Sequence, residues 1–303
     1  MIGSLEVSVI GLGCNNFGRS LDADESARVV HAALDAGMNY FDVASNYGGG
    51  QAESFLGAAL AGRRGDVVIA TKFGMPVAGV EGSGGASPEY VRGIVERSLS
   101  ELGTDYIDLY QLHLPDPETP IEETLQVLDE LVEQGTVREI GCSNMDTAQL
   151  AETLDASAEN DLASFVSNQV HYSMVHREPE DSGLVELSAE RGVAVLPYFP
   201  LASGLLTGSA RRGETPQGRL GTDRYRRFVT EENFDLAERL EGFAMDRGLS
   251  MAEVAVGWLL TRDTVPAVTP GVSTPEQVEI NASAAVWDPT QEELKALESV
   301  VTG

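Results

Sequence analysis

The stretch FDVASNYGGG, residues 41–50, passes from apolar positions into a carboxylate and then places a tyrosine on a glycine-rich turn. This pattern is typical of a buried strand that carries an acidic side chain to its carboxyl end and a phenol to the loop beyond it. Such loops often carry functional side chains. A solvated aspartate and a surface tyrosine would give the same pattern. The stretch is therefore interpreted together with Lys72 and His113, which lie on the next two predicted strands.

Short β-rich segments alternate with amphipathic helical segments along the chain. Strands are predicted at residues 8–14, 38–42, 67–73, 106–114, 137–144, 164–171, 193–200 and 265–272. Helices are predicted at residues 22–36, 51–61, 88–102, 120–134, 147 onward, 184–190, 231–247, 251–261, 275–285 and 289–301. This alternation indicates repeated βα units around a parallel sheet.

Eight strands, each followed by a helix, predict an α/β protein with a (β/α)8 TIM barrel that residues 1–303 form as a single domain. An extra helix precedes the eighth strand, and a C-terminal helix follows the barrel. The competing arrangement is a doubly wound sheet, whose first strand should lead into a G-x-G-x-x-G turn. The corresponding stretch, GLGCNN at residues 11–16, supplies only the first two glycines. The barrel is therefore the favoured fold.

The charge of the chain excludes several classes of partner. Lys and Arg number 20 against 48 Asp and Glu, which gives a formal net charge of −28. A chain this acidic has no electrostatic attraction for nucleic acid or for an anionic membrane surface. The sequence shows neither a long apolar run that predicts a membrane span nor an amino-terminal signal peptide. We expect a cytoplasmic protein that acts on a small molecule as a monomer or weak homo-oligomer.

Cysteine and lysine are both scarce. Cys14 and Cys142 are too few for a disulfide framework, which favours a reducing compartment. Lys72 and Lys295 are the two lysines of the chain. An acidic, lysine-poor composition resembles that of proteins from salt-accumulating cells, although a high-GC genome also favours arginine. If the chain is salt-adapted, salt should stabilise the fold because it screens repulsion among carboxylates.

Lys72 lies inside the apolar stretch VVIATKF, where a lysine is unusual unless it is paired. One interpretation is structural, with a lysine–aspartate pair joining two strands. The other is functional, because a compact ammonium lowers the pKa of a neighbouring acid. His113 is either a core residue or one of the polar residues that gather at the carboxyl ends of barrel strands. In a barrel, Asp42, Tyr47, Lys72 and His113 should meet, since their strands are neighbours.

These residues resemble the aldo-keto reductases in order and spacing, and the resemblance covers nearly the whole chain. Residues 41–48, 70–74 and 109–113 resemble the catalytic segments of that family. The catalytic residues that the resemblance implies are Tyr47, Lys72, Asp42 and His113. Other segments resemble its nicotinamide, pyrophosphate and adenosine segments. They imply the cofactor-binding residues Ser143, Asn144, Gln169, Tyr198, Leu201, Ser203, Gly204, Leu205, Gly271, Ser273, Gln277 and Asn281. No metal ligand is predicted.

The resemblance implies reduction of an aldehyde or ketone to an alcohol with NADP(H) or NAD(H). A phenol with an ordinary pKa of about 10 is a poor acid near neutrality. Lys72 is expected to lower the pKa of Tyr47, and Asp42 is expected to keep Lys72 charged. Tyr47 then donates a proton to the forming alkoxide. His113 is expected to position the carbonyl oxygen with a hydrogen bond, while the nicotinamide supplies the hydride.

The sequence departs from the family pattern at the nucleotide end. Ser273 and Thr274 stand where many members place a lysine or arginine for the 2′-phosphate of NADP. NADP(H) is still predicted as the cofactor, with NAD(H) as the alternative. Arg219 is the nearest replacement cation if residues 201–230 fold across the nucleotide. The same segment could equally be solvated and disordered. The chain also lacks the long tail of larger members, which favours an open pocket.

A second function stays open at this point. The family also contains cofactor-sensing regulatory or scaffold subunits, which keep the barrel and nucleotide site without significant turnover. Tyr47 and its expected support from Lys72 favour an enzyme. Glu53 is either a brace for the site or a solvated helix residue. The physiological substrate is not predicted, because Phe17 and two long loops, residues 75–86 and 201–230, are expected to shape the pocket.

Overall fold

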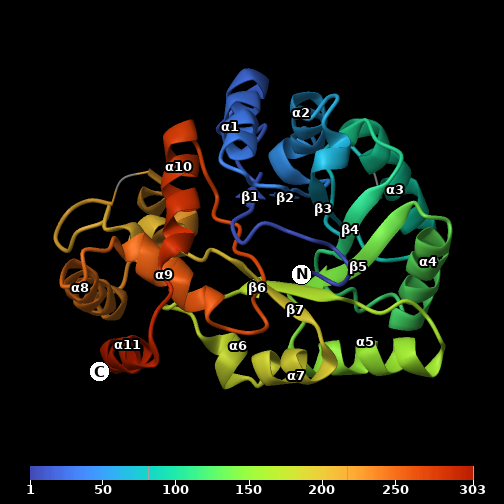
Figure 1. Cartoon of the computed structure of the whole chain (residues 1–303). Helices are drawn as coiled ribbons and strands as arrows, with labels where there is room; N and C mark the ends of the chain where they lie inside the picture. Colours follow the sequence, from blue (N-terminus) through green and yellow to red (C-terminus); the bar gives the residue numbers. More distant parts are fainter. Residues whose placement is uncertain (81, 217, 303) are drawn as a thin grey trace.

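The computed structural model describes residues 1–80, 82–216 and 218–302, and these contain a curled sheet of seven parallel strands. The strands pair in chain order, and helices surround the sheet (Figure 1). They are β1 (Leu12–Gly13), β2 (Tyr40–Asp42), β3 (Val68–Phe73), β4 (Ile107–Leu112), β5 (Val137–Ser143), β6 (Ser167–His171) and β7 (Ala194–Tyr198). Because all the pairs are parallel, the carboxyl ends of the strands lie on one face of the molecule.

The prediction of a regular eighth strand is wrong, because residues 265–272 form isolated bridges instead of a continuous ladder. Gly11 N donates to Val268 O at 2.9 Å, which places this segment beside β1. Pro266 and Pro270 have no N–H, so the segment cannot donate regularly to a neighbouring strand. The segment nevertheless lies where the eighth strand of a barrel belongs. The predicted (β/α)8 architecture is confirmed, with an irregular eighth position.

The helices begin close to the predicted residues. Asp22, Ser87 and Asp146 each accept a hydrogen bond from a backbone N–H in the first turn of the helix that follows, as N-cap residues do. The short α6 is not predicted, because four residues carry too little periodicity. The helices are α1 (Ala23–Asp35), α2 (Ala52–Ala59), α3 (Pro88–Leu102), α4 (Ile121–Glu133), α5 (Thr147–Glu159), α6 (Glu178–Asp181), α7 (Leu184–Arg191), α8 (Glu231–Met245), α9 (Met251–Leu260), α10 (Pro275–Ser283) and α11 (Gln291–Thr302).

Alternate residues of the strands face the interior of the barrel, and their character changes along its axis. Apolar residues fill the amino-terminal end: Ile2, Leu5, Tyr40, Val68, Ala70, Leu109, Ala194, Leu196 and Ala267. Two positions further along β2, β3, β4 and β7, the same alternation brings Asp42, Lys72, Gln111 and Tyr198. The fold therefore fills one end of the barrel with apolar side chains and gathers polar groups at the other, where the strands end.

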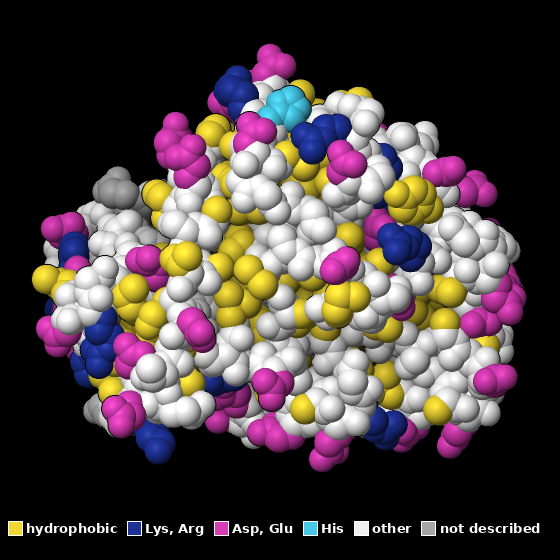
Figure 2. All heavy atoms as spheres, viewed as in Figure 1, with side chains coloured by type: hydrophobic (Ala, Val, Ile, Leu, Met, Phe, Trp, Pro, Cys, Tyr) yellow, Lys and Arg dark blue, Asp and Glu magenta, His cyan; other side chains and the backbone are white. Residues whose placement is uncertain are grey.

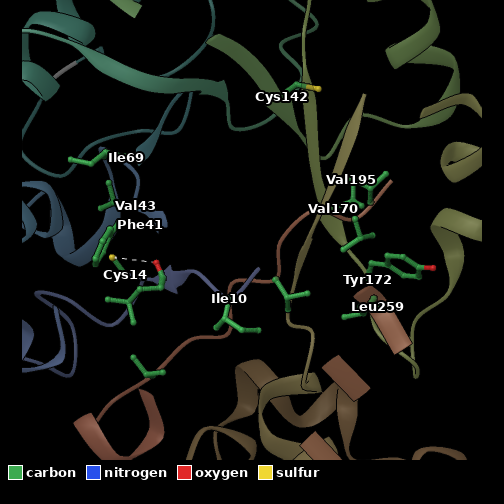
Figure 3. Packing of buried hydrophobic residues seen from close by; sticks show 14 of the residues in the cluster. Ile10, Cys14, Phe41, Val43, Ile69, Cys142, Val170, Tyr172, Val195 and Leu259 are labelled. Carbon is green, nitrogen blue, oxygen red and sulfur yellow. Dashed lines mark hydrogen bonds between the residues drawn. The ribbon is translucent and has the colours of Figure 1, made fainter. Parts of the chain in front are cut away.

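The outward-facing residues of the strands pack against the helices. Val170 of β6, and Tyr172 just after that strand, lie near Leu259 of α9, for example (Figure 3). Cys14 and Cys142 belong to the same core and form no disulfide. Burial raises the pKa of both thiols well above the ordinary value, so neither is reactive near neutrality. Both cysteines act as small core residues.

The surface reflects the composition. Acidic side chains project from the outer helices across the face shown in Figure 2, and basic side chains are fewer. In the described part of the chain, no helix combines the length and the apolar character needed to cross a membrane.

Three short 3₁₀ helices within residues 201–230, η3 (Ala202–Thr207), η4 (Gly218–Gly221) and η5 (Asp223–Phe228), follow β7, and each contributes buried side chains to the core. Leu220, Tyr225 and Phe228 are each 3% exposed. The interpretation of this segment as a solvated surface loop is therefore wrong for these residues. Gln217, which also belongs to the segment, lies outside the described residues.

Candidate active site

A cavity of about 890 Å³ opens at the carboxyl ends of the strands. Its lining includes the predicted site residues Asp42, Tyr47, His113, Ser143, Asn144, Gln169, Tyr198 and Gly271. These residues come from β2, β5, β6, β7, the loops after β2, β4 and β5, and the irregular eighth segment. A large cavity with converging polar groups is the expected form of a small-molecule site.

Lys72 lies beneath the cavity and forms a buried ion pair with Asp42. Its Nζ donates to Asp42 Oδ1 at 2.6 Å and to Val43 O at 2.9 Å, and its side chain is fully buried. Gln169 Nε2 also donates to Asp42 Oδ1, at 3.1 Å. Desolvation alone would lower the pKa of Lys72, but the charges of Asp42 and Tyr47 outweigh it and raise the pKa. The ammonium is therefore charged at every physiological pH.

Tyr47 reaches the cavity from the turn that follows β2. The Lys72 ammonium lies 5.2 Å from the centroid of its ring, and the ring of His113 lies 5.9 Å away at 77°. Gly48 holds this turn in place: its φ is +58°, and a Cβ there would stand 2.2 Å from Phe17 O. Tyr47, Lys72 and His113 thus come together as the neighbouring strands predict.

The pKa of Tyr47 departs from the expected direction. Burial raises the pKa above the ordinary value and exceeds the lowering that the Lys72 charge causes, while Asp42 raises it further. The expectation that Lys72 lowers the pKa below its ordinary value is therefore wrong for the free protein. The sequence shows the opposite charge beside the phenol, whereas the cost of placing a phenolate in a dry site depends on tertiary packing.

His113 is neutral in this structure. Burial lowers its pKa to about 3, and the nearby charge of Lys72 adds to the lowering. Its Nδ1 is buried without a hydrogen-bond partner among the described residues. A neutral imidazole at a cavity wall can donate a hydrogen bond to a bound oxygen or accept one from a bound donor.

Glu53 braces the strand that carries Lys72 instead of standing in solvent. It is 1% exposed, and its carboxylate accepts hydrogen bonds from Thr71 Oγ1 at 2.6 Å and from Ser98 Oγ at 3.3 Å. Burial raises the pKa of Glu53. Because Thr71 precedes Lys72, this contact ties β3 to the helices behind the site.

An amide cluster stands at the ends of β5, β6 and β7. Ser143 Oγ donates to Gln169 O at 2.7 Å, and Asn144 Nδ2 donates to His113 O at 3.0 Å. The hydroxyl of Tyr198 donates to Asn144 Oδ1 at 2.8 Å and thereby orients that amide. Asn144 has a φ of +61°, a left-handed conformation that asparagine tolerates better than most residues. The cluster presents amide and hydroxyl groups beside an aromatic ring.

The predicted pyrophosphate segment begins just after β7 and has an unusual backbone. Phe199, Ala202, Ser203 and Gly204 all have positive φ values, at +55°, +46°, +58° and +108°. Successive residues of this kind turn backbone N–H groups toward one side, which favours an anion. Ser203 Oγ is buried without a hydrogen-bond partner among the described residues. Leu201 is partly buried, and Leu205 is fully buried in the core.

The predicted adenosine end lies at the irregular eighth segment and the start of α10. Arg219 Nη2 donates to Tyr225 Oη at 2.9 Å and to Asn15 Oδ1 at 3.4 Å. A Cβ at Gly271 would lie 3.1 Å from Arg219 Nη1, so η4 crosses close to the cavity wall. Ser273 N donates to Gln277 Oε1 at 2.7 Å. Asn281 is buried further along α10.

Several lining residues are not among those predicted. Outside the predicted site residues, the lining contains Gly13, Asn15, Gly18, Arg19, Asn46, Gly48, Gly49, Met75, Leu114, Phe199, Tyr225, Arg227 and Thr269. Met75, Tyr225 and Arg227 belong to the two loops that were expected to shape the pocket. Most of the unpredicted lining residues lie in loops that carry no motif, and the packing of residues 218–228 decides which of that segment's side chains reach the cavity. Phe17 is not part of the lining, contrary to expectation, because it is fully buried beneath the loop. In the described part of the chain, no group of His, Cys, Asp or Glu is arranged to hold a metal ion.

We expect stability to fall as the pH drops below about 6.5. Burial lowers the pKa of both His113 and His171 to about 3, whereas an unfolded imidazole titrates near pH 6.5. Between these values the unfolded chain binds protons that the native state excludes. The stabilisation is therefore complete above about pH 6.5 and is lost as the pH falls toward about 3. Thermal midpoints of the wild type and of His171→Asn between pH 7 and pH 4 measure it.

The variant curve should be shallower than that of the wild type, because one of the two histidines no longer contributes. His31→Asn, at an exposed position on α1, is the matched control for loss of an imidazole. Parallel curves for the wild type and His171→Asn would show that His171 does not cause the acid sensitivity.

Comparison with known proteins agrees with this geometry. The model of the aldo/keto reductase family matches residues 9–302. The chain is 30% identical to a probable voltage-gated potassium channel subunit beta of Oryza sativa subsp. japonica, over 98% of this chain and 94% of that protein. It is 32% identical to the L-glyceraldehyde 3-phosphate reductase of Escherichia coli (strain K12), over 92% of this chain and 84% of that protein.

A solved structure resembles the whole fold. The holo form of an aldo-keto reductase from Bacillus halodurans superimposes with a TM-score of 0.83 at 33% sequence identity, covering 99% of this chain and 95% of that one. Family model, relatives and structure agree over nearly the full length. The chain belongs to the aldo/keto reductase family.

Proposed function

We propose that the protein reduces an aldehyde or ketone to an alcohol with a nicotinamide cofactor, and that Tyr47 donates the proton. The observation that carries this proposal is the arrangement of Tyr47 at the cavity over the buried Lys72–Asp42 pair, whose Nζ···Oδ1 distance is 2.6 Å. Family membership supports an oxidoreductase. The identity of the acid and the roles of its neighbours are part of the proposal.

The residues of the cavity fit a nicotinamide cofactor. Ser143, Asn144 and Gln169 present amide and hydroxyl groups that match a carboxamide, and Tyr198 offers a ring face beside them. The orphaned Ser203 hydroxyl stands in a left-handed turn that suits a pyrophosphate. When bound, the cofactor supplies the hydride.

The protein residues position the carbonyl group, transfer the proton and stabilise the resulting charge. His113, as a neutral imidazole, holds the carbonyl oxygen by a hydrogen bond beside the Tyr47 phenol. Tyr47 transfers its proton to that oxygen as negative charge develops. Lys72 stabilises the phenolate that remains, which matters more because burial disfavours that anion. Asp42 keeps the ammonium charged and oriented.

Turnover of simple carbonyl compounds tests the proposal. We expect the purified protein to oxidise NADPH, with NADH as the alternative cofactor, when supplied with a panel of aldehydes and ketones, and to form the corresponding alcohols. Loss of the absorbance of the reduced nicotinamide, together with product analysis, measures this. Absence of alcohol from every pairing of substrate and cofactor would contradict the enzyme assignment.

The second candidate is a cofactor-sensing subunit. One relative, at 30% identity, is named a probable voltage-gated potassium channel subunit beta. This name is the reason for a regulatory role as the second candidate. This role predicts nicotinamide binding with little turnover. The same panel therefore separates the two functions, provided that cofactor binding is measured in parallel by fluorescence titration.

For the cofactor, we propose NADP(H) with a modest preference over NAD(H). Ser273 and Thr274 bring hydroxyl groups to the start of α10, where anions are favoured, but no full positive charge. Arg219 at the cavity wall is the nearest arginine in the proposed adenosine region. We expect Ser273→Arg to raise the ratio of kcat/KM for NADPH to that for NADH by about 10-fold, because a charge-assisted contact is added.

Ser283→Arg, which adds the same charge at the other end of α10, is the control and should leave the ratio unchanged. Salt should erode the preference in the Ser273→Arg variant, since a charged contact is screened. A higher kcat/KM for NADH at every salt concentration would overturn the NADP(H) assignment. An unchanged ratio in Ser273→Arg would mean that the 2′-phosphate binds elsewhere.

A further inference from the structure

The arginines of this acidic protein fall into two groups. Most of those whose side chains the structure describes pair with carboxylates. Arg212, for example, contacts Glu231, Asp235 and Glu238. Among the described side chains, those without a carboxylate within 4.0 Å are Arg19, Arg28, Arg219, Arg227 and Arg239. A guanidinium group without a carboxylate partner keeps a charge that an anionic ligand can compensate.

Three of these five arginines lie at the cavity, whereas Arg28 and Arg239 do not line it. Arg19, from the loop after β1, and Arg227, from η5, both line it and are both exposed to solvent. Arg219 stands at its wall beside Gly271, at the proposed nucleotide end. Asp42 is the one carboxylate among the described lining residues, and Lys72 already compensates it. The cavity therefore carries net positive charge in a protein of net charge −28.

The guanidinium of Arg227 lies beside aromatic rings. Its guanidinium carbon lies 5.1 Å from the ring centroid of Phe228 and 5.7 Å from that of Phe199. Burial lowers the pKa of His171 to about 3, and the charges of His176 and Arg227 add to that lowering. Since its neighbours are rings and neutral imidazoles, Arg227 gains little charge compensation within the described protein. A planar guanidinium supported in this way suits a carboxylate or a phosphate.

We propose that Arg19 and Arg227 bind an anionic group of the substrate, so that the protein selects aldehydes or ketones that also carry a carboxylate or a phosphate. This inference rests on the proposed carbonyl reduction, since Tyr47 and His113 line the same cavity and would hold the carbonyl end. Arg219 is left to the cofactor. Specificity would then come from opposite ends of the substrate, with the reacting oxygen at the base and the anion at the rim.

Matched pairs of substrates test this with the cofactor-loaded enzyme. The first pair is 4-oxobutanoate and its methyl ester, and the second is glyceraldehyde 3-phosphate and glyceraldehyde. We expect the wild type to prefer a charged member. Arg227→Gln and the Arg19→Gln/Arg227→Gln double variant should lower that preference by about 10- to 100-fold, mainly through KM. The substrate pair whose charge preference falls more in these variants shows whether the site binds a carboxylate or a phosphate.

Arg28→Gln is the matched control, because it removes an equally unpaired exposed arginine from α1, outside the cavity lining. It should change no preference, which separates local contact from the loss of one charge on an acidic surface. Dissociation constants for NADPH, measured by fluorescence, should stay within about twofold in Arg227→Gln. Equal losses for charged and neutral substrates, or a matching loss of NADPH affinity, would assign Arg227 to the cofactor and overturn the proposal.

A failure of the proposed reduction is distinguishable from a failure of this inference. If no aldehyde is turned over, succinate binding to the NADPH-loaded protein is measured by calorimetry in the wild type, Arg227→Gln and Arg28→Gln. Succinate binding that weakens about 10-fold or more in Arg227→Gln alone supports the anion site without catalysis. Binding that is absent, or that is equal in all three proteins, overturns it.

Discussion

Tyr47→Phe is expected to lower kcat for carbonyl reduction by about 10²- to 10⁴-fold, the usual contribution of a positioned general acid. The variant removes one hydroxyl and keeps the ring that packs against His113, at a centroid distance of 5.9 Å. Cofactor binding should change little, because the amide cluster and the segment after β7 stay intact. Steady-state kinetics with an aldehyde, together with a fluorescence titration of NADPH, measure both quantities.

Tyr106→Phe is the matched control for removal of a phenol. Tyr106 directly precedes β4 at the end of the barrel opposite the cavity, where Arg64 lies 4.0 Å from its ring centroid. This control should keep its kcat. A Tyr47→Phe variant that retains more than about a tenth of the wild-type kcat would exclude Tyr47 as the proton donor.

Lys72→Met and Asp42→Ala are expected to be strongly non-additive. The Nζ···Oδ1 distance is 2.6 Å, and both groups are removed from water. Loss of either partner leaves the other charge buried, which costs about 3–5 kcal/mol in comparable pairs. If Asp42 acts through Lys72, the double variant should lose little more kcat/KM than Lys72→Met alone, and it should regain part of the stability lost in each single variant.

A double-mutant cycle measured both on kcat/KM and on the free energy of unfolding tests this coupling. Asp108→Asn is the control, because Asp108 is a fully buried acid paired with Arg64 at 2.6 Å at the other end of β4. It should reduce stability and leave kcat of the folded protein near the wild-type value. Simple additivity of the two site variants in kcat/KM would show that Asp42 has a separate role.

The raised pKa of Tyr47 bears on the role of Lys72. Because burial raises that pKa, Lys72 does not turn Tyr47 into a strong acid in the free protein. In the proposed mechanism, Lys72 instead limits the free-energy cost of forming the phenolate inside the protein. Removing Lys72 should therefore lower kcat/KM more than the loss of a favourable surface charge would. Without Lys72, the phenolate would be buried without a compensating charge.

Much of this protein could be predicted from its sequence. Alternating β-rich and helical segments predict βα units around a parallel sheet, because a parallel strand needs a crossover helix before the next. The incomplete glycine motif at residues 11–16 then favours the barrel over a doubly wound sheet. Asp22, Ser87 and Asp146 mark helix starts, since their side chains satisfy first-turn N–H groups locally. The meeting of Lys72 with Asp42 also follows from order along the chain, because successive barrel strands are neighbours.

Other features were decided only by tertiary structure. The irregular eighth position depends on two prolines meeting a short β1, and the direction of the Tyr47 pKa depends on how dry its surroundings are. The approach of Arg227 to the cavity depends on how residues 218–228 pack across it. Local spacing reports which residues share a strand or a helix face. Desolvation and loop placement depend on contacts between segments that are distant in the sequence. These contacts form only when the chain folds.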